Sequence, residues 1–399
     1  MDKHTVDGET PVQLCNYTDA YKKDRVHPGA DLMRATATAD EIRKNRLKVG
    51  DSVFTKDSED PNDIGVSAFI DGTGDDFVCG YHLAIARPFP STHGRFLNWA
   101  LRSRPVLEHF GNHAAGISRY GIGLADLRSA PIPLVEADEQ RRIADFLDDR
   151  VSRIDRIIAA RREQMQSSDD HYVSWLQEHV DALGHRFGWV ELRRLGMRIE
   201  QGWSPEADST PAAAGEPGVL KLGAVRGGTF HPDENKGFLD GTTPRREYLI
   251  GEGDLLMTRA NTPALVGEAA VVENVGPSPL YLSDLIYRIK LARMDHTLAA
   301  AAVRSARVRQ EIGIIARGTS GSMPKLRGTD LARLEVPLVP TTSQLDAGRA
   351  DTAARRLRDA RRRDLQNSID LLTEYKSSLI TAAVTGKLDV STAGSGIPG

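Results

Sequence analysis

The amino-acid sequence contains a long internal repeat. Three residues recur 204 positions later in the second half: Leu127, Pro133 and Gln140 return as Leu331, Pro337 and Gln344. Two further segments match at an offset of 203, namely 50–56 (GDSVFTK) and 253–259 (GDLLMTR). A repeat of this length is too long for a solenoid unit and long enough for each copy to form its own core. The sequence therefore predicts two similar modules, which suit the recognition of two similar but non-identical targets.

Composition restricts the function classes. The chain has 399 residues and a net charge of −3, which argues against a broadly basic nucleic-acid coat but leaves room for a local positive face. No run approaches 18 apolar residues and the N-terminus is polar, so we expect no membrane span and no signal peptide. Cys15 and Cys79 share no C-x-x-C motif; we expect buried thiols in a reducing cytoplasm rather than a disulfide or zinc site.

Each half begins with a mixed stretch, 12–135 and 189–340, in which short apolar runs are broken by glycine, proline and aspartate. This texture is typical of short strands in an α+β domain. The expected strands include Ser52–Thr55, Val66–Ile70 and Tyr81–Ala86 in the first module, and Val219–Leu222, Asp254–Thr258, Ala269–Val272 and Leu285–Leu291 in the second.

A long helical pattern follows each mixed stretch. Apolar residues spaced by three, four or seven run from Ile143 to Val180, and a thinner stripe runs from Leu345 to Ala383. We expect the helices to stop at Gly184 and Gly386. Neither helix can bury its stripe alone, so we expect an antiparallel coiled-coil-like pair that separates two globular domains, with an internal pseudo-two-fold duplication.

This interpretation gives five segments. They are a first domain at 1–135, a central helical repeat at 136–184, a second domain at 185–340, a C-terminal helical repeat at 341–390 and a disordered tail at 391–399. The first domain is expected to be short at its front, because the stretch 189–218 has no evident counterpart before Val12.

No catalytic signature stands out. The sequence has no Walker A motif, no nucleophile elbow in a strand–helix context and no G-x-G-x-x-G opening a βα unit. Glu108, His109 and His113 lack a metal-binding order, and we expect surface residues there. The acidic cluster around Asp57, Asp60 and Asp63 is more typical of a polar turn, although separated carboxylates could also belong to a metal-dependent nuclease. We therefore expect no catalytic residues and no bound metal.

Several segments, in this order and duplicated, carry a family resemblance. In the first half they are 17–21 (YTDAY), 54–58 (FTKDS), 79–83 (CGYHL), 94–98 (GRFLN), 131–134 (PIPL) and 139–148 (EQRRIADFLD). In the second half they are 201–205 (QGWSP), 220–228 (LKLGAVRGG), 258–262 (TRANT), 318–323 (GTSGSM) and 379–386 (LITAAVTG). The chain resembles the specificity subunit of a type I restriction-modification system over roughly residues 12 to 390.

The resemblance implies a non-catalytic subunit that recognises DNA. Each globular domain would be a target-recognition domain for one half of an asymmetric bipartite sequence, and the helices would fix the gap. Two methyltransferase subunits would dock on the helical repeats and carry the S-adenosylmethionine chemistry. An ATP-dependent restriction subunit, which uses magnesium, would join them. No cofactor is expected on this chain itself, and the location is expected to be cytoplasmic.

Candidate site residues follow from the side chains that suit DNA, which are cations, amides, hydroxyls and aromatic rings. The DNA-binding candidates are Tyr17, Lys22, Lys23, Arg25, Lys56, Arg119 and Tyr120 in the first module, and Trp203, Arg226, Arg259, Asn261, Thr319, Ser320 and Lys325 in the second. The partner-binding candidates are Glu139, Gln140, Arg141, Phe146 and Gln344. Two alternatives stay open at this point: a nuclease with a carboxylate site, and a bivalent scaffold that does not bind DNA.

Overall fold

The computed structural model describes residues 5–29, 31–316 and 323–391. The chain divides into two compact units: unit 1 is Met1–Arg162 with Gln366–Gly399, and unit 2 is Glu163–Leu365. Three predictions made from the sequence concern residues that the structure does not describe. These are Thr319, Ser320 and the part of the expected tail from residue 392 onward.

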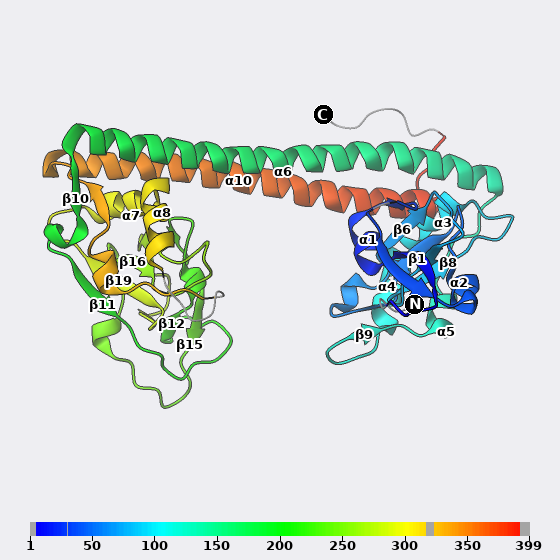
Figure 1. Ribbon diagram of the computed structural model, residues 1–399, viewed down its shortest axis with the longest axis horizontal. Coiled ribbons are helices and arrows are strands. Elements are labelled where there is room, and N and C mark those ends of the chain that lie inside the picture. Colours follow the sequence, from blue (N-terminus) through cyan, green and yellow to red (C-terminus); the bar gives the residue numbers. More distant parts are fainter. Residues whose placement is uncertain (1–4, 30, 317–322, 392–399) are drawn as a thin grey trace. The chain divides into compact units, whose positions relative to one another are not determined.

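Two long helices are shared by the units (Figure 1). Helix α6 spans Ala137–Phe187 and α10 spans Thr341–Val384, each without interruption. Acidic residues occupy the first turn of α6, where they suit the positive end of the helix dipole. Within unit 2 the helices run antiparallel, because partner numbers fall along α10 as they rise along α6: Asp169 pairs with Arg362, and His179 Nε2 lies 3.2 Å from the Ala347 carbonyl.

The predicted stop at Gly184 is wrong. Helix α6 continues to Phe187 and ends at Gly188, whose φ of 85° is the left-handed conformation that glycine adopts at helix ends. Gly184 has a packing role instead, since a Cβ built there would lie 2.2 Å from the ring of Trp189. The glycine lets the indole lie directly on the helix backbone.

We therefore expect Gly184→Ala to destabilise unit 2 by about 1–3 kcal/mol, as overpacked cores do, although alanine is the better helix former. Gly313 is the matched control. It lies inside helix α8, Ala306–Ile315, and a Cβ there meets no atom within 4 Å. Gly313→Ala should stabilise the protein by up to about 1 kcal/mol. Urea unfolding of both variants would measure this contrast, and equal stabilisation by both would contradict the packing role.

Unit 1 contains two main sheets. The first has the order β2-β6-β4-β8 and the second the order β3-β1-β7, while β5 and β9 form a separate pair. The bounds in the first sheet are β2 Arg25–Val26, β6 Ser67–Ile70, β4 Ser52–Thr55 and β8 Leu83–Ala86. The others are β3 Met33–Ala37, β1 Thr10–Cys15, β7 Phe77–Cys79, β5 Asp57–Ser58 and β9 Tyr120–Gly121.

Unit 2 repeats this plan. Its sheets have the orders β11-β19-β16-β17 and β15-β12-β18, with two further pairs, β10-β20 and β13-β14. The larger sheet comprises β11 Arg198–Gln201, β19 Ile286–Lys290, β16 Leu255–Thr258 and β17 Ala269–Val271. The others are β15 Asn235–Gly237, β12 Gly218–Leu220, β18 Leu280–Tyr281, β10 Trp189–Glu191, β20 Glu335–Pro337, β13 Val225–Arg226 and β14 Thr229–Phe230.

Register shows the equivalence of the two sheet systems. In unit 1, Ser52 lies opposite Ala86 and Phe69; in unit 2, Leu255 lies opposite Ile289 and Val271. The edges differ. Strand β11 extends the unit 2 sheet beyond β19, whereas in the described part of unit 1 the added strand is β2, which pairs with β6 at the opposite edge.

Short helices complete each unit. Unit 1 has α1 Tyr17–Lys22, α2 Ala39–Asn45, η1 Pro61–Asp63, α3 Gly94–Leu101, α4 Arg104–His113 and α5 Leu124–Arg128. Unit 2 has η2 Leu192–Leu195, η3 Leu222–Ala224, η4 Arg246–Tyr248, α7 His296–Arg304, α8 and α9 Gly328–Leu331. Six consecutive residues of α7, from Leu298 to Val303, are buried, and four of them are alanines that permit close packing on every side. None of the described helices is both long and apolar enough to cross a membrane.

The two cysteines lie opposite each other on the parallel strands β1 and β7. Both thiols are free and buried. Burial raises the pKa of Cys79 to about 12 and also raises the pKa of Cys15. At pH 8 both should therefore stay unreactive toward a thiol reagent in the folded protein and react fully in guanidinium. A rapid reaction of either thiol in buffer would show that β1 and β7 open locally.

Candidate nucleic-acid interface

A buried threonine ends the central strand of each unit. Thr55 Oγ1 donates to the Asp63 carbonyl at 2.5 Å and accepts from the Val66 amide at 3.0 Å. Thr258 Oγ1 does the same with the Leu265 carbonyl, at 2.9 Å, and the Glu268 amide, at 3.0 Å. Both threonines are nearly inaccessible to solvent. They fix the backbone at the point where the strand leaves the core.

A cation follows each of these threonines. In unit 1 the Lys56 amide donates to the His82 carbonyl at 3.1 Å, and the Ile122 amide donates to the Lys56 carbonyl at 3.0 Å. In unit 2 the Arg259 amide donates to the Leu285 carbonyl at 2.8 Å, and the Leu326 amide donates to the Arg259 carbonyl, also at 2.8 Å. The two cations thus occupy equivalent backbone positions.

A returning segment pairs beside each cation. Strand β9 places Tyr120 opposite Ser58 and Gly121 opposite Asp57. In unit 2, Lys325 forms an antiparallel bridge with Ala260. We call residues 56–58 with 120–121, and residues 259–261 with 324–325, the strand-end platforms. Each platform offers a cation whose backbone is fixed by hydrogen bonds, next to main-chain groups. Such a cation can position phosphates or approach base edges.

The platform of unit 1 is surrounded by aromatic and charged side chains. Arg119 Nη2 donates to Asp57 Oδ1 at 2.6 Å, and His82 Nδ1 lies 2.7 Å from the same oxygen. The Lys56 ammonium lies 4.6 Å from the centre of the Tyr81 ring. Tyr17 is exposed and contacts His82 edge to face. The structure therefore brings together Tyr17, Lys56, Arg119 and Tyr120 from the predicted set.

The platform of unit 2 carries a different set. Arg259 Nε donates to the Tyr287 hydroxyl at 3.1 Å, and its guanidinium lies 5.9 Å from the centre of that ring. The Asn261 amide donates to the Pro324 carbonyl at 3.4 Å, and Lys325 is exposed beside it. Arg259, Asn261 and Lys325 are thus neighbours.

Trp203 and Arg226 lie outside the unit 2 platform. The Trp203 ring holds the Arg245 guanidinium at 4.4 Å from its centre and contacts Phe238 edge to face. Its indole nitrogen is buried without a hydrogen-bond partner in the part of the chain that the structure describes. Arg226 is exposed on β13. These contacts give Trp203 a packing role within its own unit and leave Arg226 accessible.

The remaining candidates of unit 1 lie on α1 and β2. Lys22 is exposed. Lys23 forms ion pairs with Asp31 and, at 3.5 Å, with Asp19. Arg25 donates to Asp148 Oδ2 on α6 at 2.8 Å. Lys23 and Arg25 therefore already serve contacts within the chain.

The two glutamines of the predicted partner set are anchors within the chain. Gln140 is 5% exposed, accepts from the His93 amide at 2.7 Å and donates to the Val135 carbonyl at 2.8 Å. Gln344 is 7% exposed, accepts from the Asp295 amide at 2.9 Å and donates to the Val339 carbonyl at 2.8 Å. His93 and Asp295 are the N-caps of α3 and α7. The repeat in the sequence is thus a repeated joint between each long helix and its domain.

Three other residues of that set lie on the first turns of α6. Glu139 pairs with Arg142, and Arg141 is exposed, 3.8 Å from Asp138. Phe146 is half-buried beneath the Arg150 guanidinium, which lies 5.5 Å from the ring centre. Of the predicted partner set, these three side chains are the ones with surface exposed to solvent.

The acidic cluster is occupied by local contacts. Asp57 binds Arg119 and His82, and Asp60 accepts from the Asn62 amide at 2.9 Å as the cap of η1. Among residues 5–29, 31–316 and 323–391, no group of three or more His, Cys, Asp or Glu side chains is arranged to hold a metal ion.

Sequence reasoning missed several residues of these surfaces. Tyr81 and His82 complete the unit 1 platform, and Tyr287 supports Arg259 in unit 2. Tyr81 and His82 belong to a segment that carries the family resemblance, and this could have identified them as candidates. Tyr287 lies within a predicted strand, and its spacing gives no sign that its hydroxyl reaches Arg259.

Comparisons with known proteins point in one direction. No protein-family model matches the chain. A curated protein, the Type I restriction enzyme EcoEI specificity subunit of Escherichia coli, is 33% identical over 108 residues. The match covers 27% of this chain and 18% of the length of that relative.

Solved structures resemble the chain over most of its length. A chain from "Structural basis underlying complex assembly and conformational transition of the type I R-M system" has a TM-score of 0.66 at 15% identity, covering 95% of this chain and 93% of the other. The HsdS subunit from Thermoanaerobacter tengcongensis has a TM-score of 0.47 at 15% identity, with coverages of 95% and 92%. The resemblance inferred from the sequence and the α+β fold class are confirmed.

Proposed function

We propose that this chain is the non-catalytic DNA-recognition subunit of a type I restriction-modification complex. The local sequence match to a specificity subunit and the shared fold support this role. One observation carries it: the same strand-end platform occurs in both units, with the same backbone hydrogen bonds but different side chains. Two equivalent surfaces with different side chains suit two different half-sites of one asymmetric sequence.

The proposed recognition domains are 1–135 and 185–340. Lysine and arginine side chains bind phosphates and guanine edges, and asparagine binds adenine edges. In the first domain we assign DNA contacts to Lys56, Arg119, Tyr120, Tyr17 and Lys22, with weaker roles for Lys23 and Arg25 because both are ion-paired. In the second domain the proposed contacts are Arg259, Asn261, Lys325, Arg226, Thr319 and Ser320, with a weaker role for Trp203 because its ring packs against Arg245 and Phe238.

The helical repeats are the proposed docking surfaces for two methyltransferase subunits. Leu134 and Leu338, 204 positions apart, are 99% and 48% exposed just before α6 and α10. Their equivalence in the repeat is what the proposal of one partner copy on each repeat rests on, since a single exposed leucine is common on protein surfaces. Of the predicted set, Glu139, Arg141 and Phe146 can contribute, whereas the buried Gln140 and Gln344 would act by holding the joint. S-adenosylmethionine, ATP and magnesium would reside on the methyltransferase and restriction subunits, in the cytoplasm.

A domain exchange tests the proposal. Residues 189–340 would be replaced by the matching segment of a related chain, and methylated adenines would be mapped across the genome. We expect one half of the recognised sequence to change while the other half and the gap persist. An unchanged methylation pattern would sink the DNA-recognition role and favour a scaffold. Loss of activity on replacing Asp57, Asp60 and Asp63 by alanine, with DNA binding intact, would instead favour a nuclease.

A further inference from the structure

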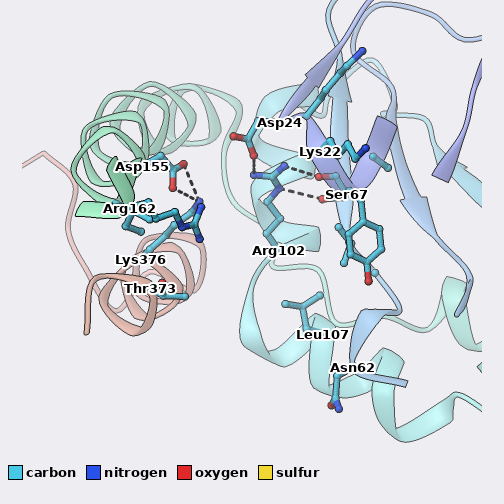
Figure 2. Close-up of a pocket in the computed structure, with 16 residues that line it drawn as sticks. Lys22, Asp24, Asn62, Ser67, Arg102, Leu107, Asp155, Arg162, Thr373 and Lys376 are labelled. Atoms are coloured by element: carbon cyan, nitrogen blue, oxygen red, sulfur yellow. Dashed lines mark hydrogen bonds and ion pairs between the residues drawn. The ribbon is translucent and has the colours of Figure 1, made fainter. Parts of the chain in front are cut away.

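Unit 1 contains a pocket of ≈ 540 Å³ between its globular part and its segments of α6 and α10 (Figure 2). The globular part contributes Lys22, Asp24 and Arg102. The helices contribute Asp155 and Arg162 from α6 and Thr373 and Lys376 from α10. In Figure 2 the helix side chains lie across the pocket from Arg102. Leu107 and Ile158 add apolar wall.

The lining is strongly cationic. Five cations and two carboxylates contribute to it, namely Lys22, Lys23, Arg102, Arg162 and Lys376 against Asp24 and Asp155. Two of the cations are held by these carboxylates: Arg102 Nη1 donates to Asp24 Oδ1 at 2.7 Å, and Lys376 Nζ donates to Asp155 Oδ1 at 2.6 Å. Lys23 is paired with Asp19 and Asp31. Within the part of the chain that the structure describes, the exposed Lys22 and Arg162 side chains have no ion-pair partner.

The corresponding place in unit 2 is closed. Arg304, the residue before the α8 cap Ser305, corresponds to Arg102, the residue before the α4 cap Ser103. Arg304 donates to Asp351 Oδ2 on α10 at 2.7 Å and to the Tyr172 hydroxyl on α6 at 3.2 Å. All three side chains are buried. In unit 1 the residue 204 positions after Tyr172 is Lys376, which binds Asp155 on the neighbouring helix instead, and both line the pocket.

We propose that this pocket binds a phosphate group, and that Lys22 and Arg162 bind it directly. An oxyanion there would neutralise the two unpaired cations without displacing either existing ion pair. Arginine and lysine are the side chains that most often serve this role. The inference rests on the proposed function, because a subunit that binds DNA would take the phosphate from the DNA backbone. A free phosphate or pyrophosphate is the other source of the same chemistry.

The two units would therefore contact the DNA backbone in different ways. A helix side chain, Arg162, would touch the DNA backbone together with the recognition domain in unit 1. In unit 2, the buried Arg304–Asp351 ion pair occupies the equivalent position. The contact would carry no sequence information, since phosphates are the same at every step.

The experiment compares the full-length wild type with Lys22→Ala/Arg162→Ala by titration with a mixed-sequence duplex at several salt concentrations. We expect the variant to weaken binding of all duplexes by the same factor. Its slope of log Kd against log salt should fall by about 1–2, because each lost phosphate contact removes about one released counterion. The matched control is Lys44→Ala/Arg156→Ala, which removes the same charge from exposed positions on α2 and α6 outside the pocket.

Calorimetric titration with sodium pyrophosphate separates the outcomes. Duplex binding with an unchanged slope in the variant overturns the pocket while leaving the proposed function standing. If the wild-type protein binds no duplex, the proposed function loses its support and the pocket is decided by pyrophosphate alone. In that case, the wild type and the control should bind pyrophosphate and the pocket variant should not. This result would support a phosphate site for a free ligand. If all three proteins bind pyrophosphate equally, or none of them binds it, the phosphate site is refuted.

Discussion

Replacing Asp351 by alanine is expected to lower the free energy of unfolding of unit 2 by about 3–5 kcal/mol, the cost of leaving a buried charge without its partner. The Arg304 and Asp351 side chains are 7% and 4% exposed and lie 2.7 Å apart. Burial lowers the pKa of Arg304, but the charge of Asp351 and the interactions with Tyr172 and Asp351 together outweigh burial and raise that pKa. Because an arginine side chain is not deprotonated in proteins, Asp351→Ala would leave a charged guanidinium buried in the core without its partner.

Denaturant unfolding followed by fluorescence can measure this loss, because three of the four tryptophans, Trp175, Trp189 and Trp203, belong to unit 2. Arg304→Met/Asp351→Leu is the informative control. Removing both charges and filling the space should cost much less than removing one. Asp149→Ala breaks an exposed pair with Arg153 on α6 and should cost about 0.3–0.5 kcal/mol. A small effect of Asp351→Ala would mean that water reaches Arg304.

The second large effect concerns recognition. We expect Arg259→Ala to relax discrimination in one half-site by about 1–3 kcal/mol, or roughly 5- to 150-fold, and Lys56→Ala to weaken contacts to the other half-site. The physical reason is that each cation is fixed by main-chain bonds on both sides, so its loss is not compensated by a shift of the backbone. Binding to duplexes randomised in one half-site at a time would measure both effects.

Lys44→Ala and Arg333→Ala serve as matched controls, since both residues are exposed and lie outside the platforms. They should leave discrimination unchanged in either half-site. The assignment of one platform to one half-site fails if Arg259→Ala and Lys56→Ala alter the same half. It also fails if both variants weaken all duplexes equally, because that pattern belongs to phosphate contacts.

Much of the fold was predictable because it depends on periodicity. The strands Ser52–Thr55 and 255–258 were expected from the matched segments, and both long helices from their apolar stripes. The end of α6 was not predictable. Glycine is a common stop signal, and only the three-dimensional contact with Trp189 shows that Gly184 is needed inside the helix.

The site was less predictable, because side-chain chemistry does not reveal partners. Lys56 and Arg259 followed from the repeat and occupy equivalent positions. Arg25 resembled them as a loop cation, yet it pairs with Asp148, which lies 123 residues away in the sequence. Gln140 and Gln344 resembled surface residues of a helix start, yet their amides bind the main chain of α3 and α7. Contacts between residues so far apart in the sequence cannot be predicted from the local sequence pattern.

The division of the chain also sets an order for its synthesis. Unit 2 is one uninterrupted stretch, Glu163–Leu365, whereas unit 1 needs Gln366–Gly399 to join residues that emerge first from the ribosome. Arg104 pairs with Glu374, and Asp155 with Lys376, so both must wait until unit 2 has been translated. At ~5–20 residues per second this wait is roughly 10–40 s. The nascent first domain would spend that time with the surface that contacts α10 uncovered, exposed to chaperones and proteases.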